Sequence, residues 1–169
     1  MARIGLFKNL IGKGQRGSIS IASPLSGAVI PLESVPDEAF AKKLMGDGVA
    51  VLPDEGIVVA PFDGVVETVP ESLHAVGLVS DEGVELLVHV GVETVSLGGR
   101  YFTVRVAEGD RVKAGDVLIE FDLEAIRAAG YRTETPVIVV NGDDYAGAGS
   151  VAAGTVRRGE PLLVLREKD

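Results

Sequence analysis

Short apolar runs, rich in valine, isoleucine and leucine, are separated along this chain by frequent glycine and proline. Such short runs between turn signals predict many short β-strands, a pattern typical of all-β sandwiches and barrels. The runs that predict strands are residues 18–21, 28–32, 49–52, 57–59, 73–79, 84–92, 101–106, 117–121, 137–140 and 162–165. The sequence therefore predicts an all-β fold.

Helical signals are few. Residues 36–38 (Pro-Asp-Glu) can open one helical turn that runs through Lys43, and Asp122 can cap a short helix through Ala128. We expect only short helices between the strands.

Two internal repeats suggest a duplication. Residues 23–29 (SPLSGAV) resemble residues 60–66 (APFDGVV), and residues 112–118 (VKAGDVL) resemble residues 156–162 (VRRGEPL). Two related β-motifs closing around one core would explain both repeats, whereas a solenoid would repeat at a fixed period. We expect an antiparallel sandwich/barrel hybrid with an internally duplicated motif, formed as a single domain by residues 18–169.

The chain has only two histidines, and a β-hairpin brings them together. The strands 73–79 and 84–92 flank a four-residue turn signal, Ser80-Asp81-Glu82-Gly83. If Val79 faces Val84, then His74 lies directly opposite His89, and directly opposed side chains have Cβ atoms roughly 4.5–5.5 Å apart. Imidazole suits the transfer of protons, metals or phosphoryl groups near neutral pH.

The alternation of apolar and mixed positions along residues 84–92 predicts which face of the strand carries His89. The even positions are all apolar and predict the core face, whereas the odd positions are mixed. His89 is therefore expected to be half-exposed, with an apolar shoulder at Leu87 and no covering side chain at Gly91. An imidazole in this setting suits docking against another protein.

Composition narrows the classes of function. The 169 residues are 46% hydrophobic and include no cysteine, which excludes a disulfide scaffold and a cysteine nucleophile. Aromatic residues are sparse and the net charge is −9, so nucleic acid is not an expected partner. There is no signal-peptide pattern or bilayer-length apolar run, which favours a cytoplasmic protein.

The first residues differ from the rest of the chain. Residues 1–16 carry four basic side chains and no acidic one, and Ile4, Phe7, Leu10 and Ile11 fall on one helical face. We expect residues 1–17 to be either a flexible tail or an amphipathic segment that makes weak contact with a membrane surface.

The residues alone also allow a hydrolytic zinc site or a lipoyl- or biotin-carrier module. A hydrolytic zinc site usually needs three protein ligands, and only a carboxylate such as Glu93 could complete one here. A lipoyl- or biotin-carrier module fits the strand-turn pattern of residues 108–118, but Lys113 lies within that pattern rather than at a separate hairpin tip. The sequence has no Gly-x-Ser-x-Gly element, P-loop or dinucleotide fingerprint.

Residues 83–95 (GVELLVHVGVETV) resemble the active-site signature of the glucose-class enzyme IIA of the bacterial sugar phosphotransferase system. Further segments that are similar to this family are residues 22–28, 35–37, 40–43, 46–50, 59–64, 80–86 and 117–123. The resemblance covers nearly the whole chain and implies an EIIA type-1 domain in residues 18–169.

The resemblance implies that His89 accepts a phosphoryl group from phospho-HPr and passes it to a cysteine of a IIB domain. That domain would belong to a glucose- or N-acetylglucosamine-class permease. His74 matches the family's second active-site histidine, which supports the phosphoryl group and its onward transfer. Ser72 stands where the family has a threonine, and it keeps a hydroxyl near His74.

The partner-binding residues implied by the resemblance are Phe40, Leu87, Gly91, Glu93 and Val95, with Glu93 in place of an aspartate. No cofactor is required for this reaction. Zinc would bind in regulatory complexes only, held by His74 and His89 together with a carboxylate of the partner.

Overall fold

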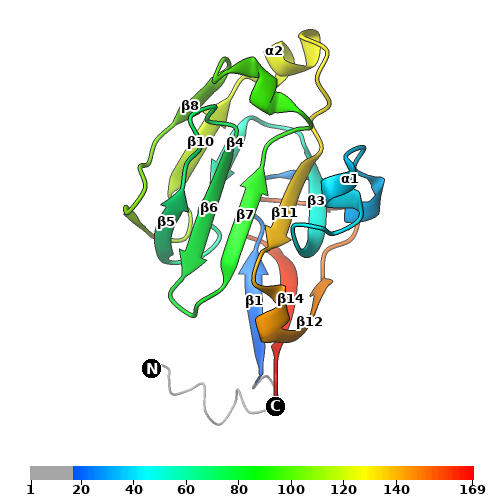
Figure 1. Cartoon of the computed structure of the whole chain (residues 1–169), viewed down its shortest axis with the longest axis vertical. Coiled ribbons are helices and arrows are strands. Elements are labelled where there is room, and N and C mark those ends of the chain that lie inside the picture. Colours follow the sequence, from blue (N-terminus) through cyan, green and yellow to red (C-terminus); the bar gives the residue numbers. More distant parts are fainter. Residues whose placement is uncertain (1–16) are drawn as a thin grey trace.

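The computed structural model describes residues 17–169 (Figure 1). Of the segment 1–17, predicted to be flexible or amphipathic, residues 1–16 lie outside the described residues. The strands are β1 (Ser18–Ala22), β2 (Gly27–Pro31), β3 (Asp47–Pro53), β4 (Ile57–Val59), β5 (Gly64–Thr68), β6 (Ala75–Ser80), β7 (Glu85–His89), β8 (Phe102–Val104), β9 (Arg111–Val112), β10 (Val117–Phe121), β11 (Thr135–Val139), β12 (Tyr145–Ser150), β13 (Thr155–Val156) and β14 (Pro161–Glu167). The α-helices are α1 (Glu38–Ala41) and α2 (Leu123–Ala128), and the 3-10 turns are η3 (Leu32–Ser34), η4 (Thr94–Leu97) and η5 (Gly142–Asp144).

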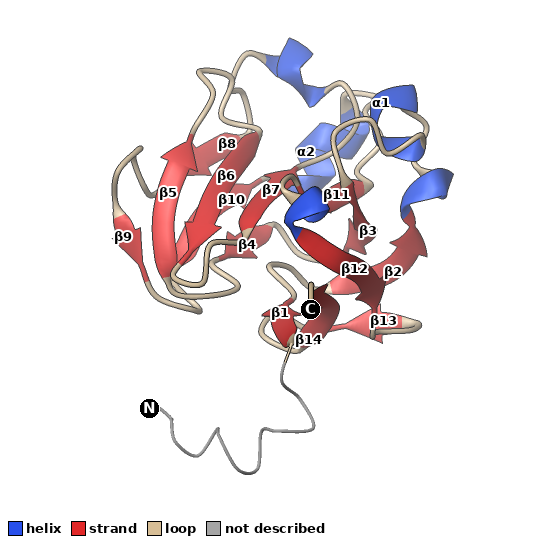
Figure 2. Ribbon diagram, turned by 60° about the horizontal axis from the view of Figure 1, so that its bottom comes forward, coloured by secondary structure: helices blue, strands red, loops and turns tan. Residues whose placement is uncertain are grey.

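The strands form three antiparallel sheets (Figure 2). The largest has eight strands in the order β13-β2-β3-β11-β7-β6-β5-β9, and the smaller sheets have the orders β1-β14-β12 and β4-β10-β8. Because no pairing in the described residues is parallel and the helices are short, the predicted all-β sandwich/barrel class is confirmed.

The internal duplication is confirmed by equivalent backbone contacts. In the first copy Gly27 pairs with Val156, and in the second copy Gly64 pairs with Val112. The copies also share hydrogen bonds outside the strands, because the N–H of Ser23 donates to Glu160 as that of Ala60 donates to Asp116. Counted from either edge of the eight-stranded sheet, equivalent strands therefore follow in the same order, and a pseudo-twofold axis lies between β7 and β11.

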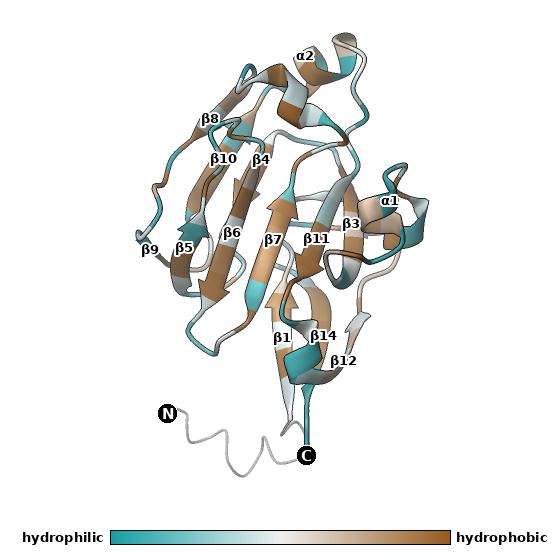
Figure 3. Ribbon diagram, in the orientation of Figure 1, coloured by the Kyte–Doolittle hydropathy of each residue, from teal (hydrophilic) through white to brown (hydrophobic). Residues whose placement is uncertain are grey.

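The apolar strand faces form one main core. Along β7 and the residues that flank it, the even positions predicted to face inward are buried, including Val84, Leu86 and Val88. The ribbons of β1, β6, β7 and β14 are mostly hydrophobic in Figure 3. A second, smaller apolar cluster lies beneath α1 and consists of Leu32, Val35, Phe40, Ala50, Val92 and Ile138.

The two predicted helices form where their capping residues lie. The side chain of Asp37 accepts a hydrogen bond from the N–H of Ala39, and that of Asp122 accepts one from Ala125. Helix α1 ends before the predicted Lys43, which has a positive φ of 60°. No helix among residues 17–169 is long and apolar enough to cross a membrane.

Candidate functional site

The predicted hairpin forms between β6 and β7, but its register differs by one residue. His89 pairs with Ala75 rather than with His74, and Val79 pairs with Glu85 rather than with Val84. The cause is the turn. The N–H of Ser80 donates the closing hydrogen bond to the carbonyl of Val84, so the loop has three residues and contains Gly83 with a φ of 95°. A glycine in this conformation is common in three-residue hairpin loops.

The two imidazoles are nevertheless neighbours. Their ring centroids are 4.7 Å apart and the rings are almost perpendicular, at 82°. A one-residue shift in a regular hairpin would place them on opposite faces. His74, however, precedes β6 and follows Leu73, whose φ of 61° interrupts the strand alternation. The carbonyl of His74 accepts a hydrogen bond from the N–H of Val90, which keeps the segment beside the end of β7.

Helix α1 covers His89 from another part of the chain. The rings of Phe40 and His89 have centroids 4.9 Å apart and are tilted by 57°. Phe40 is only 3% exposed, so its ring packs against His89 instead of projecting into solvent, and its contact with a partner stays a prediction. Gly91, another residue predicted to contact a partner, is also buried.

The hydrogen bonds of His89 define its tautomer. Nδ1 of His89 lies 2.9 Å from the carbonyl oxygen of Gly91. Because a carbonyl only accepts, Nδ1 carries the proton, and Nε2 of the neutral ring keeps a lone pair. Gly91 has a φ of 80° and Thr94 donates from its hydroxyl to the carbonyl of Val90, so this backbone turn is held in place.

His74 has a different partner. Its Nδ1 lies 2.9 Å from the hydroxyl oxygen of Ser72. A serine hydroxyl donates or accepts, so both neutral tautomers of His74 fit this contact. When Ser72 donates, the proton of His74 is on Nε2, and that N–H is free for another acceptor.

Burial keeps the histidine pair uncharged near neutral pH. His74 is 6% exposed, and its burial lowers its pKa to about 4. The positive charge of a protonated His89 adds to this shift, and a hydrogen bond with the Ser72 backbone opposes it. The pKa of His89 is also lowered by burial, against the hydrogen bond to Gly91 and the negative charge of Asp37.

The remaining predicted residues lie around this pair at different depths. Leu87 is half-buried against the small cluster beneath α1, Glu93 is exposed in a left-handed conformation before η4, and Val95 is 54% exposed. The resemblance did not single out the exposed Leu44 and Met45 after α1, or Asp37 at its N-terminus. Two apolar residues directly before a glycine, beyond the end of a short helix, were the signal for Leu44 and Met45.

The described residues contain no group of three or more metal-ligating side chains placed to hold a metal ion. His74 and His89 supply two nitrogens, so a zinc ion would need a further ligand from outside this part of the chain.

Comparisons with known proteins agree with the fold. The glucose permease IIA of Mycoplasma capricolum matches with a TM-score of 0.79 and 32% sequence identity, over 87% of this chain and 95% of that one. A sequence profile described as "phosphoenolpyruvate-dependent sugar phosphotransferase system, EIIA 1" matches residues 19–145. The fold thus places the chain in the class of β-sandwich IIA domains.

Sequence relatives define the family more closely. The glucose-specific EIIA component of Bacillus cereus is 48% identical over 139 residues, which are 82% of this chain and 84% of that protein. The β-glucoside-specific EIIBCA component of Dickeya chrysanthemi is 48% identical over 146 residues, 86% of this chain but 23% of its own length. The chain spans about a quarter of these β-glucoside relatives. The chain belongs to the EIIA 1 family of the sugar phosphotransferase system, as a component of the glucose class.

Proposed function

We propose that this chain is a cytoplasmic phosphocarrier that uses His89 as its phosphoryl acceptor. Nε2 of His89 attacks the phosphorus of a phosphohistidine on HPr. The new N–P bond forms as the bond to the HPr imidazole breaks. In the second step a cysteine thiolate of a IIB domain attacks the same phosphorus, an S–P bond forms, and His89 leaves as the neutral imidazole.

The tautomer of His89 supports this role. The hydrogen bond to Gly91 fixes the proton on Nδ1, so the lone pair of Nε2 is available as the nucleophile. The lowered pKa keeps that lone pair unprotonated at neutral pH. Phosphoryl transfer asks mainly for positioning and charge stabilisation, and the ring of Phe40 restricts the imidazole to one orientation.

His74 supports the transferred group from the side. With Ser72 donating to its Nδ1, His74 has an Nε2–H that can donate to a phosphoryl oxygen. Phosphorylation brings negative charge next to His74 and therefore raises its pKa from the low value of the free site. His74 and Ser72 thus stabilise the phosphohistidine and prepare it for onward transfer.

The surface around the pair supports protein partners. Val95 is an exposed apolar residue, and Asp37 and Glu93 add carboxylates beside α1 and η4. Such a surface suits an apolar patch with basic groups on HPr and on a IIB domain. The β-glucoside relatives are named EIIBCA components, which supports a IIB domain of a sugar permease as the receiving partner.

The reaction needs no bound cofactor on this chain. Zinc would join only in regulatory complexes, with His74 and His89 as two ligands and a carboxylate of the partner as the third. A partner from the N-acetylglucosamine class of permeases fits the same chemistry as one from the glucose class, because the sugar binds the permease.

The pairing of His74 with a tautomer-fixed His89 is the observation that carries the proposal. The test is a phosphotransfer assay with enzyme I, HPr, radiolabelled phosphoenolpyruvate and a glucose-class IIB domain. We expect an acid-labile phosphate on the wild-type chain and none on His89→Ala. His74→Ala serves as the matched variant and should lose donation to IIB more than uptake from HPr. An acid-labile phosphate that persists in His89→Ala would exclude the acceptor assignment.

A further inference from the structure

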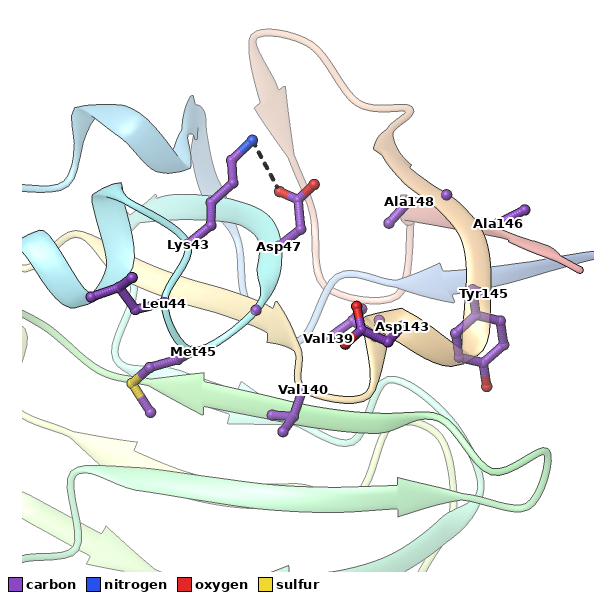
Figure 4. Close-up of a pocket in the computed structure, with 13 residues that line it drawn as sticks. Lys43, Leu44, Met45, Asp47, Val139, Val140, Asp143, Tyr145, Ala146 and Ala148 are labelled. Atoms are coloured by element: carbon purple, nitrogen blue, oxygen red, sulfur yellow. Dashed lines mark ion pairs between the residues drawn. The ribbon is translucent and has the colours of Figure 1, made fainter.

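A groove of about 440 Å³ lies at the other end of the β7–β11 strand pair from the histidines. Its walls come from the loop before β3, from the end of β11 and from β12 (Figure 4). Lys43 and Asp47 form an ion pair of 3.4 Å across one wall, so their charges are already matched. Leu44, Met45 and Val140 are exposed apolar residues of the lining.

Strand β12 forms the opposite wall and has an unusual composition. Its sequence is YAGAGS, and its only strand partner in the described part of the chain is β14. Natural edge strands are commonly protected by charged residues or proline, and β12 has neither. The guanidinium of Arg166 lies over Gly147, but the space at Gly149 is open. Strand β12 is therefore suited to accept an additional segment of polypeptide.

Acidic groups surround the mouth of the groove. Burial raises the pKa of Tyr145, and the carboxylates of Asp144, Glu167, Glu82 and Glu85 raise it further. Asp143 also lines the groove. Lys43 is engaged by Glu33 and Asp47, and the guanidinium of Arg166 lies over Gly147 of β12, so the surrounding carboxylates outnumber the cations and the charge presented to an occupant is mainly negative. The groove thus suits an occupant that combines apolar and basic side chains.

Residues 1–16 have this composition, and they join the described fold at Gly17, near the groove. Residues 1–16 carry four basic residues, no acidic residue, and the apolar residues Ile4, Leu6, Phe7, Leu10 and Ile11. They lead to Gly17, whose carbonyl is hydrogen-bonded to Glu167, and Glu167 pairs in turn with Tyr145 of the groove. Two strand spacings separate this entry from the groove, which is about 10 Å. Sixteen residues can reach much further.

We propose that residues 1–16 dock in this groove beside β12. The apolar side chains of the segment cover Leu44, Met45 and Val140, and its cations face the surrounding carboxylates. Covalent attachment supplies an effective concentration on the order of millimolar, so a weak contact is enough for occupancy.

The test uses the full chain, which has no native cysteine. A nitroxide is attached to Asn9→Cys in ¹⁵N-labelled protein at low salt. We expect paramagnetic broadening of the amides of Met45, Ala146 and Gly149, and none at Gly115, which lies in the other half of the fold. Broadening should be lost in 1 M salt, where the Debye length is about 3 Å. Unbroadened groove amides at low salt would overturn the proposal.

Two controls separate this occupant from others. Val140→Lys places a cation in the groove and should abolish the broadening, whereas Val95→Lys alters an equally exposed valine outside the groove and should leave it unchanged. A mixture of ¹⁵N-labelled unmodified chain with spin-labelled ¹⁴N chain should show no broadening. Broadening in that mixture would assign the groove to a second copy and overturn the intramolecular contact.

Discussion

The histidine site and the β12 groove occupy equivalent places in the two halves of the duplicated fold. Pro53 pairs with Gly27 as Ser80 pairs with Gly64, so Asp47 of β3 corresponds to His74. By the same comparison, the pairing of β3 with β11 corresponds to that of β6 with β7, and Ile138 corresponds to His89. One end of the β7–β11 pair thus holds two imidazoles, and the other holds a carboxylate and an aliphatic side chain.

The difference between the two ends comes from their connecting loops. The connection between β5 and β6 spans only residues 69–74, whereas the connection between β2 and β3 spans residues 32–46 and contains α1. Helix α1 places Phe40 over the histidine end and leaves Leu44 and Met45 exposed at the groove. The scaffold is symmetric, and the longer loop makes one end a covered imidazole pair and the other an open groove.

Removing the Phe40 cover should have the largest effect, because it makes the histidine end resemble the open groove end. Phe40→Ala should lower the free energy of unfolding by about 3–5 kcal/mol, because it empties a buried aromatic site. The pKa of His89 should rise towards 6.5, since burial is the main cause of its lowering. Urea unfolding and NMR titration measure these changes. Val95→Ala is the exposed control and should alter neither; an unchanged His89 pKa in Phe40→Ala would contradict the role of α1.

The sequence predicted much of this architecture, and its failures have local causes. Short valine-rich runs and the two repeats were sufficient to predict the all-β fold and its duplication, because they follow from strand alternation and turn chemistry. The register of the histidine hairpin was wrong by one residue because the glycine turn allows loops of three or four residues. The positive φ of Leu73 brings the rings of His74 and His89 together in spite of the shifted register. No local sequence pattern predicts a positive φ at a leucine.

The contact of α1 with His89 joins positions almost fifty residues apart, so periodicity alone does not predict it. Family resemblance points to Phe40, but only the packing of α1 shows that its ring is buried. Leu44 and Met45 were missed for the same reason, because the direction of the chain after α1 decides whether they are core or surface.

The pH dependence of stability tests His74, the residue that corresponds to Asp47 of the groove half. The pKa of His74 is about 4 in the folded chain and near 6.5 when unfolded, so the unfolded state binds more protons between these values. Stability should therefore fall as the pH drops through this range. The contribution of His74 at pH 4 is a loss of about 3 kcal/mol relative to pH 7.5.

His74→Gln removes this titration while keeping a side chain that can hydrogen-bond to Ser72. Urea unfolding at pH 4 and pH 7.5 should show a smaller difference for His74→Gln than for the wild type, with the carboxylates contributing equally to each. Equal pH dependence in the two proteins would show that His74 is not held neutral by the fold.

The smallest expected effect concerns the turn that holds His89. Gly91 has a φ of 80°, and an added Cβ would lie 2.6 Å from Cγ2 of Thr94 and 2.9 Å from the carbonyl oxygen of Arg132. Val140 stands at the equivalent position of the groove half, and its φ is not positive. Gly91→Ala must shift the carbonyl that accepts from Nδ1 of His89, so the rate of phosphoryl uptake should fall.

Gly115→Ala provides the matched control, because Gly115 has a φ of 96° but open space around its Cβ position. The two substitutions share the backbone strain, so Gly91→Ala should be less stable by about a further 1–3 kcal/mol, the usual range for overpacking. Urea unfolding measures the stability difference, and ¹⁵N chemical shifts of the His89 ring report the tautomer. Unaltered ring shifts and an unchanged uptake rate in Gly91→Ala would show that this carbonyl does not set the reactive nitrogen.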